Sequence, residues 1–329
     1  MNGTGDFRAS GQDLSPYYSP TVPAGVVTAQ NDCLGLTQSG SRTSTLTFSK
    51  PVIAPMIHVI NMDASSLRVT GTSTTGAPIS LQRAAGNNSL AVSSTVINTT
   101  LSQPNNNGCE TNTGGNPSGA CGSVRLTAAS GLVKSVTLFN STDSSVVANG
   151  DGWGYALSFP TAELTKAFSP TTIAPDGVSA LTFSITNPAS EAQPTLWPLD
   201  FTDALPSGVR IANSSATIGS GCGAPTVAGG NGPIAAGDTT VSVVGISVST
   251  GATCTITVNV TGSTPGSYTN NTSNLSTNVA NLIPNANTTL TIARTVDTPM
   301  IAAPGAAAAA VITLGGLLLH RFRQRGTLR

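Results

Sequence analysis

Charged residues are scarce in this chain of 329 residues: Asp, Glu, Lys and Arg make up 9% of it, against about 25% in average soluble domains. Residues 321–329 hold four Arg and no acid, so the residues before them contain 10 basic and 14 acidic side chains, a net charge of −4. Such a surface lacks the basic patch that binds nucleic acid. We therefore expect no nucleic-acid partner.

Histidine is nearly absent, because His58 and His320 are the only two. His58 lies in the apolar run MIHVIN, where a lone histidine is more often a packed structural residue than a general base. The chain has no GxSxG motif, no phosphate-binding glycine loop and no metal-binding helix. As a pair, Asp200 and Asp203 suggest acid–base chemistry, but aspartates before a Pro-Ser-Gly turn commonly bond to their own backbone, which we expect here. We predict no catalytic residues and no enzymatic activity.

Long amphipathic helices are missing from the pattern, and apolar residues instead alternate with polar ones. This period of two predicts an all-β fold rather than disorder. Residues 1–30 suggest a linker or a truncated start, and residues 31–160 predict a β-sandwich of the jelly-roll type. The strands expected in this first domain are Thr43–Phe48, Met56–Asn61, Leu67–Gly71, Leu90–Ile97, Val124–Thr127, Val133–Phe139 and Trp153–Phe159.

Residues 161–294 show the same alternation and predict a second, immunoglobulin-like β-sandwich. In TTVSVVGISV the inward-facing set passes from Val241 and Val243 to Ile246 and Val248, so the alternation slips by one residue. We expect a β-bulge at the intervening Val-Gly pair to absorb it. Other strands are expected in SALTFSITN, CTITVNV and TTLTIA, and near Phe168, Val209–Ile218, Tyr268–Asn274 and Asn278–Ile283.

Three blocks in this region carry a family resemblance: LTKAFSPTTIAPDGVSALTFSITNP, DFTDALPSGVRIA and GATCTITVNVTGSTPGSYTN. Together they make residues 163–292 resemble the conserved-repeat, immunoglobulin-like domain of bacterial surface proteins. The resemblance implies a β-sandwich that serves as a spacer or display module, and it brings no catalytic residues. Members of that family often contain several copies, whereas this chain contains one.

Charge is also absent from Met300 to Leu319, an apolar run followed by a cluster of cations that includes Arg321, Arg323 and Arg325. About twenty apolar residues cross a bilayer as a helix, and cationic residues just beyond them tend to stay in the cytoplasm. We predict that residues 295–329 form a transmembrane tail with a cytoplasmic C-terminus. An Ala-rich surface helix or a disordered end is the alternative.

The tail also resembles the tripartite C-terminal sorting signals of Gram-negative surface proteins, in which a short motif precedes a membrane segment and an Arg cluster. The resemblance implies a membrane protease that removes the tail, although VDTPMIAAPG contains neither a PEP nor an IPTL element where the motif is expected. The protein is then either anchored by a single span or processed and released. MNGTGDFRASGQDLSPYYSP lacks the features of an export signal, so we expect the native start to lie upstream. Export by another route and no export at all are the alternatives.

Five cysteines suit an oxidising compartment when they are paired. Cys222 and Cys254 flank the middle of the second domain and form the best predicted disulfide. Cys109 and Cys121 bracket the loop ETNTGGNPSGA and are a second candidate. Cys33 is then left over, and three thiols in one domain allow three pairings that the sequence does not resolve. No CxxC or Cys/His spacing supports zinc.

The segment NGDGWGYALSFP and the residues before it offer a candidate binding surface. Aromatic side chains on a strand often stack on sugar rings, and Asp143, Asn149 and Asp151 carry oxygens suited to calcium. Trp153 and Tyr155 share their strand face with two core-type residues, however, so core packing is the simpler interpretation. A carbohydrate platform and a calcium site both stay open.

Taken together, these features predict a non-enzymatic structural or adhesion protein of the cell envelope, displayed outside a membrane by residues 300–319. A carbohydrate-binding module in the first domain, with calcium as its candidate cofactor, is the alternative function. The expected partners are the membrane, a sorting protease, and a glycan or protein at the surface.

Overall fold

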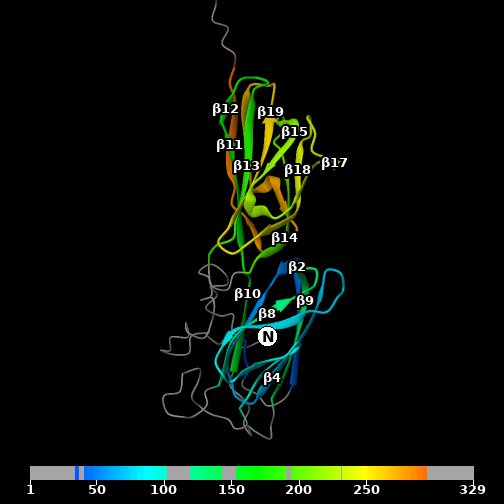
Figure 1. Ribbon diagram of the computed structural model, residues 1–329, viewed down its shortest axis with the longest axis vertical. Coiled ribbons are helices and arrows are strands. Elements are labelled where there is room, and N and C mark those ends of the chain that lie inside the picture. Colours follow the sequence, from blue (N-terminus) through cyan, green and yellow to red (C-terminus); the bar gives the residue numbers. More distant parts are fainter. Residues whose placement is uncertain are drawn as a thin grey trace, which may run out of the picture. The chain divides into compact units, whose positions relative to one another are not determined.

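β-Strands make up nearly all regular structure in the part of the chain that the computed structural model describes, which is residues 34–36, 41–101, 119–142, 153–189, 194–230 and 232–294. Within those ranges the exceptions are two single 3₁₀ turns, Ser220–Cys222 and Thr272–Asn274. Figure 1 shows the strands along the chain. The all-β architecture predicted from the period-two pattern is therefore confirmed.

Two five-stranded antiparallel sheets form from the strands before residue 160, with strand orders β1-β10-β3-β8-β5 and β2-β9-β4-β7-β6. The first sheet contains β1 (Leu34–Leu36), β10 (Trp153–Ser158), β3 (Met56–Met62), β8 (Ala120–Thr127) and β5 (Ser80–Gly86). The second contains β2 (Ser41–Ile53), β9 (Leu132–Thr142), β4 (Ser65–Ser73), β7 (Val96–Thr99) and β6 (Leu90–Val92).

The inner faces of these two sheets share one hydrophobic core. Ile57 and Val124 of the first sheet and Leu67 and Val136 of the second are fully buried in the same cluster. Alternation along each strand sends these side chains inward and their neighbours outward. All seven segments expected in residues 31–160 overlap a strand of the sandwich, whereas β1 and β5 were not predicted.

The strands after residue 160 form two five-stranded sheets and a three-stranded one, with orders β15-β19-β13-β11-β22, β17-β16-β18-β14-β21 and β12-β23-β20. The first contains β15 (Arg210–Ile218), β19 (Thr253–Thr261), β13 (Val178–Thr186), β11 (Ala162–Ser169) and β22 (Leu282–Pro284). The second contains β17 (Gly232–Pro233), β16 (Thr226–Gly229), β18 (Thr240–Val248), β14 (Leu196–Ala204) and β21 (Leu275–Thr277). The third contains β12 (Thr172–Ile173), β23 (Asn287–Ile292) and β20 (Gly266–Asn271).

A second hydrophobic core joins these sheets. Phe183 on β13 and Phe201 on β14 meet across it with ring centroids 4.9 Å apart. Aromatic pairs at this separation add roughly 0.5–1.5 kcal/mol beyond the burial of their area. The core therefore fixes β13 of one sheet against β14 of the next.

The β-bulge expected in β18 is present. Leu199 pairs with Ile246 and Phe201 pairs with Val243, so two residue steps on β14 face three on β18. Gly245 has a φ of 81°, a conformation that glycine adopts without steric cost. The extra residue lets the side chains before and after the bulge face the core. The four residues predicted to face inward are all buried: Val241, Val243, Ile246 and Val248.

Five strands of this region, β12, β14, β16, β17 and β21, were not predicted. β14 is the longest of them and lies inside the second five-stranded sheet, between β18 and β21. The predicted strand Asn278–Ile283 contributes only its last two residues to β22. Asn281 lies in the part of this segment outside β22, where its buried side chain forms hydrogen bonds with the backbone of Ile53 and Pro160.

No helix within the described ranges is long and apolar enough to span a membrane. The predicted span Met300–Leu319 and its Arg cluster lie outside those ranges. The boundaries expected for the two domains stay a prediction.

Candidate functional site

The most unusual residue of the second core is a lysine. In β11 the buried positions alternate with more exposed ones, and Lys166 falls on the inner face between Leu164 and Phe168. Alternation alone sends its side chain toward the core, and that side chain is 0% exposed. Lysine is almost never fully buried without a partner, so its surroundings decide its role.

Two polar side chains from other sheets meet Lys166 in the core. Asp203 lies on the inner face of β14, two residues after the buried Phe201. Asn270 lies on β20 and has no exposed surface. One strand from each of the three sheets therefore supplies one member of this buried cluster.

Short hydrogen bonds connect every pair in the cluster. Lys166 Nζ lies 2.6 Å from Asp203 Oδ1 and donates to Asn270 Oδ1 at 2.5 Å. Asn270 Nδ2 donates to Asp203 Oδ2 at 2.7 Å. Lys166 Nζ also donates to the backbone carbonyl of Asn271 at 2.9 Å. The three side chains thus form a closed ring of hydrogen bonds.

Burial pushes both ionisable members of the cluster toward their neutral forms. Loss of solvent lowers the pKa of Lys166, and the hydrogen bond and charge of Asp203 offset this only in part. The same loss of solvent raises the pKa of Asp203, against the hydrogen bonds from Lys166 and Asn270 and the charge of Lys166. A proton passed from Nζ to the carboxylate leaves two neutral groups, which a water-free interior tolerates better than two ions.

This arrangement places a nucleophile, an electrophile and a proton carrier in contact. A neutral amine is a nucleophile, the carbonyl carbon of the Asn270 side chain is an electrophile, and the Asp203 carboxyl group contacts both the amine and the amide nitrogen.

Sequence reasoning noticed Asp203 but assigned it to its own turn, and that assignment is wrong. Asp203 bonds to Lys166 and Asn270. Asp200 does not bond to that turn either: its Oδ1 accepts from Gly245 N at 2.8 Å, and its Oδ2 accepts from Asn278 Nδ2 at 3.0 Å. Asp200 therefore satisfies a backbone N–H at the β18 bulge.

His58 is buried among hydroxyl groups of the first sandwich. Its Nδ1 lies 2.8 Å from Ser123 Oγ and its Nε2 lies 2.6 Å from Ser158 Oγ. The three residues come from neighbouring strands β3, β8 and β10. Burial lowers the pKa of His58 to about 4. These contacts fit the structural role expected for a lone strand histidine.

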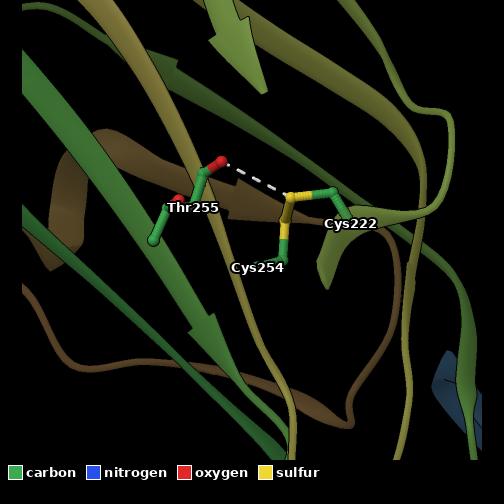
Figure 2. The surroundings of a disulfide bond; sticks show 3 residues. All are labelled: Cys222, Cys254 and Thr255. Carbon is green, nitrogen blue, oxygen red and sulfur yellow. Dashed lines mark hydrogen bonds between the residues drawn. A yellow bond between two sulfur atoms is a disulfide. The ribbon is translucent and has the colours of Figure 1, made fainter. Parts of the chain in front are cut away.

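The disulfide predicted between Cys222 and Cys254 is formed, and both residues are fully buried. Figure 2 shows it beside Thr255 of β19. Cys121 is disulfide-bonded as well, but Cys109, its predicted partner, and Cys33 lie outside the described residues.

The candidate binding residues of the first domain are only partly described. Tyr155 is 4% exposed and belongs to the first hydrophobic core, so its ring offers no free face to a sugar. The side chain of Trp153 and the whole of Asp143, Asn149 and Asp151 lie outside the described part of the chain. Among the described residues, no group of three or more acidic, histidine or cysteine side chains is arranged to hold a metal ion.

Lys166 and Asn270 were missed, although Lys166 gave a signal. In LTKAF it occupies the core-facing position of an alternating strand, in a chain with little charge. A lysine at such a position requires a buried partner, and Asp203 shows the same core-facing placement in DFTDAL. Asn270 gave no comparable signal, because asparagine is common throughout the chain.

Residues 162–292 match a family described as a domain of unknown function (DUF7933). No curated protein matches the chain. Among solved structures, the N-terminal domain of the Streptococcus gordonii adhesin Sgo0707 is similar with a TM-score of 0.44 and 12% identity, over 77% of this chain and 61% of that one. The type II cohesin dyad from the adaptor ScaA scaffoldin of Acetivibrio cellulolyticus gives a TM-score of 0.22 and 10% identity, over 78% and 95% of the two chains. Both TM-scores are too low to bear on function.

Proposed function

We propose that the chain is a non-enzymatic cell-surface protein, in which two β-sandwiches are displayed outside a membrane as a structural or adhesion module. The observation that carries this proposal is the buried disulfide between Cys222 and Cys254. Disulfides form and persist mainly in extracellular and other oxidising compartments. The second sandwich is therefore suited to the outside of the cell.

The types of sandwich support a display role. In the first, the orders β1-β10-β3-β8 and β2-β9-β4-β7 place early strands beside late ones, as in a jelly roll built from two Greek keys. In the second, sheets of mainly antiparallel strands, with parallel pairs at β11–β22 and β12–β23, share a common core, as in immunoglobulin-like domains. Both architectures commonly serve as rigid binding or spacer modules at surfaces.

The C-terminal sequence supplies the proposed attachment. Met300–Leu319 is long and apolar enough to cross a bilayer, and the following Arg cluster favours a cytoplasmic end. Processing by a sorting protease and contact with a surface glycan or protein are further parts of this proposal. The non-enzymatic part is supported by His58, whose two ring nitrogens are engaged by buried serine hydroxyls.

Fractionation of cells that express the complete native gene tests attachment. The full chain is expected in the membrane fraction, and a chain that ends at Arg294 is expected in the medium. A control with Arg321, Arg323 and Arg325 replaced by Gln keeps the apolar run and is expected to stay with the membrane. Recovery of the full chain in the medium would contradict anchoring, and recovery of both chains in the cytoplasm would contradict export.

A further inference from the structure

The buried cluster of the second sandwich brings an amine to an amide. Lys166 Nζ is 2.5 Å from Asn270 Oδ1, and a carbonyl bond is about 1.23 Å long, so Nζ lies at most about 3.7 Å from Asn270 Cγ. Reacting atoms in near-attack geometry are about 3–3.5 Å apart. A small rotation of either side chain is enough to bring the amine to the carbonyl carbon.

We propose that the protein joins Lys166 Nζ to Asn270 Cγ by an isopeptide bond, in a single reaction within its own folded chain, with Asp203 as the catalytic proton carrier. Nothing about the location of the protein is needed for this reaction. It requires only that the second sandwich folds and closes the cluster.

The steps balance without an oxidant or a cofactor. Asp203 Oδ1 takes a proton from the Lys166 ammonium, and the neutral amine attacks Asn270 Cγ, forming an N–C bond and a tetrahedral centre with negative charge on Oδ1. The Cγ–Nδ2 bond then breaks. Nδ2 takes the proton that the Asp203 carboxyl group carries and leaves as ammonia, and the resulting Asp203 carboxylate accepts the surplus proton from Nζ. The products are one secondary amide, one ammonia and a neutral Asp203 carboxyl group.

Each contact in the cluster has a role in this sequence. The bond from Nζ to Asp203 Oδ1 removes the proton that makes the amine unreactive, and the bond from Nδ2 to Oδ2 places the same carboxyl group at the leaving nitrogen. The Asn271 carbonyl holds Nζ from another side. Burial favours the neutral amine, as the lowered pKa of Lys166 indicates. The protonated product carboxyl group suits the same interior, in keeping with the raised pKa of Asp203.

The bond would tie together strands that are distant in sequence. Lys166 and Asn270 are 104 residues apart, on β11 at the start of the second sandwich and on β20 near its end. The Cys222–Cys254 disulfide closes a shorter loop inside this interval. Unlike the disulfide, the isopeptide bond survives reduction, so the sandwich would stay closed in either redox state.

A tryptic map of the reduced and alkylated full chain tests the proposal, because the lysines and arginines are conveniently placed. Without the bond, trypsin yields separate peptides 135–166, 167–210 and 211–294. With the bond, trypsin does not cleave after Lys166, and peptide 135–210 stays joined to 211–294. The mass of this joined species is lower than the sum of the two peptide masses by about 17 Da, because one ammonia is lost. Both cysteines of the disulfide lie in 211–294, so after reduction only the isopeptide bond can join the two.

Variants assign the roles. Lys166→Met and Asp203→Asn are each expected to abolish the joined species completely, while Asp200→Asn, which changes an aspartate on the same strand that does not contact Lys166, is expected to retain it fully. The tryptic map of the wild-type chain shows whether the isopeptide bond is present even if a variant fails to fold. Separate, unmodified peptides 135–166 and 211–294 from the folded wild-type chain would overturn the proposal, and a joined species that persists in Asp203→Asn would overturn the role of Asp203.

Discussion

Lys166 and Asp203 form a hydrogen-bonded pair from which solvent is excluded: Nζ lies 2.6 Å from Oδ1, and both side chains are 0% exposed. They come from different sheets of the second sandwich and stand where a hydrophobic core would ordinarily contain apolar side chains. Holding both groups here as ions would cost several kcal/mol each in lost hydration, which their mutual attraction and further hydrogen bonds would have to offset. A pair of this kind is weak as a source of stability but sensitive to the loss of either member.

Lys166→Met should therefore destabilise the second sandwich strongly. The substitution removes the hydrogen-bonding partner of Asp203 in a water-free site, whether that partner is the free amine or the proposed amide, and loss of one member of a buried pair typically costs about 3–5 kcal/mol. Denaturant unfolding followed by tryptophan fluorescence measures the change. Lys134→Met is the matched control, since Lys134 Nζ donates to the Phe48 carbonyl in a partly exposed position, and a loss below about 1 kcal/mol is expected there. Equal losses in the two variants would contradict the assignment.

The stability of the first sandwich should fall with acid because of His58. The pKa of His58 is lowered from 6.5 to about 4 by burial, so the unfolded chain binds the proton at higher pH than the folded chain does. Stability is then unaffected above about pH 6.5 and declines as the pH falls from there to about 4, by roughly 3 kcal/mol in total.

Unfolding midpoints of the wild-type chain and of His58→Gln, measured from pH 7.5 to 5, check this dependence. The wild-type midpoint should decline over the lower part of this window, and the variant should be nearly flat. If the midpoint declines by the same amount in both proteins, ionisable groups other than His58 cause the pH dependence.

Removing the disulfide should lower stability without changing the fold. In the chain-entropy model, a closed loop with the sequence separation of 32 between Cys222 and Cys254 is worth about 3–4 kcal/mol. The double variant Cys222→Ala/Cys254→Ala is therefore expected to unfold at a lower denaturant concentration. Addition of a reductant should lower the unfolding midpoint of the second sandwich in the wild-type chain by the same amount. It should leave the midpoint of that sandwich unchanged in the double variant.

Asn281 should be intolerant of substitution. Its Oδ1 accepts from Ile53 N at 2.6 Å, and its Nδ2 donates to the carbonyls of Ile53 and Pro160 at 3.1 and 2.5 Å. Asn281→Ala leaves buried backbone groups without these partners, at a cost of about 1–3 kcal/mol for each group left unsatisfied. Thermal unfolding measures the loss. Asn213→Ala, at an exposed position of β15 where Oδ1 accepts from Ser215 N, should change stability by less than about 0.5 kcal/mol, and a comparable loss there would contradict the prediction.

The features that follow from local alternation could be predicted from the sequence. The slip between Val243 and Ile246 located the bulge, because side-chain direction in a strand depends only on parity. The second core and the Cys222–Cys254 disulfide could be predicted for the same reason, since Cys254 lies on the inward face of CTITVNV together with Ile256 and Val258.

Features that depend on contacts between distant strands could not be predicted in this way. β14 contains Pro198 and two aspartates, which local propensity assigns to a turn, yet its buried Leu199 and Phe201 hold it in the sheet. The cluster of Lys166, Asp203 and Asn270 exists only because three sheets converge, and no spacing along the chain encodes that.

The most direct test of surface display is labelling of intact cells that express the complete native gene. Lys50 is exposed, so a membrane-impermeant amine reagent can reach it wherever the first sandwich faces the outside. Display at the surface predicts that Lys50 is labelled on intact cells as fully as after lysis, while an abundant cytoplasmic protein stays unlabelled. Labelling of Lys50 only after lysis would contradict it.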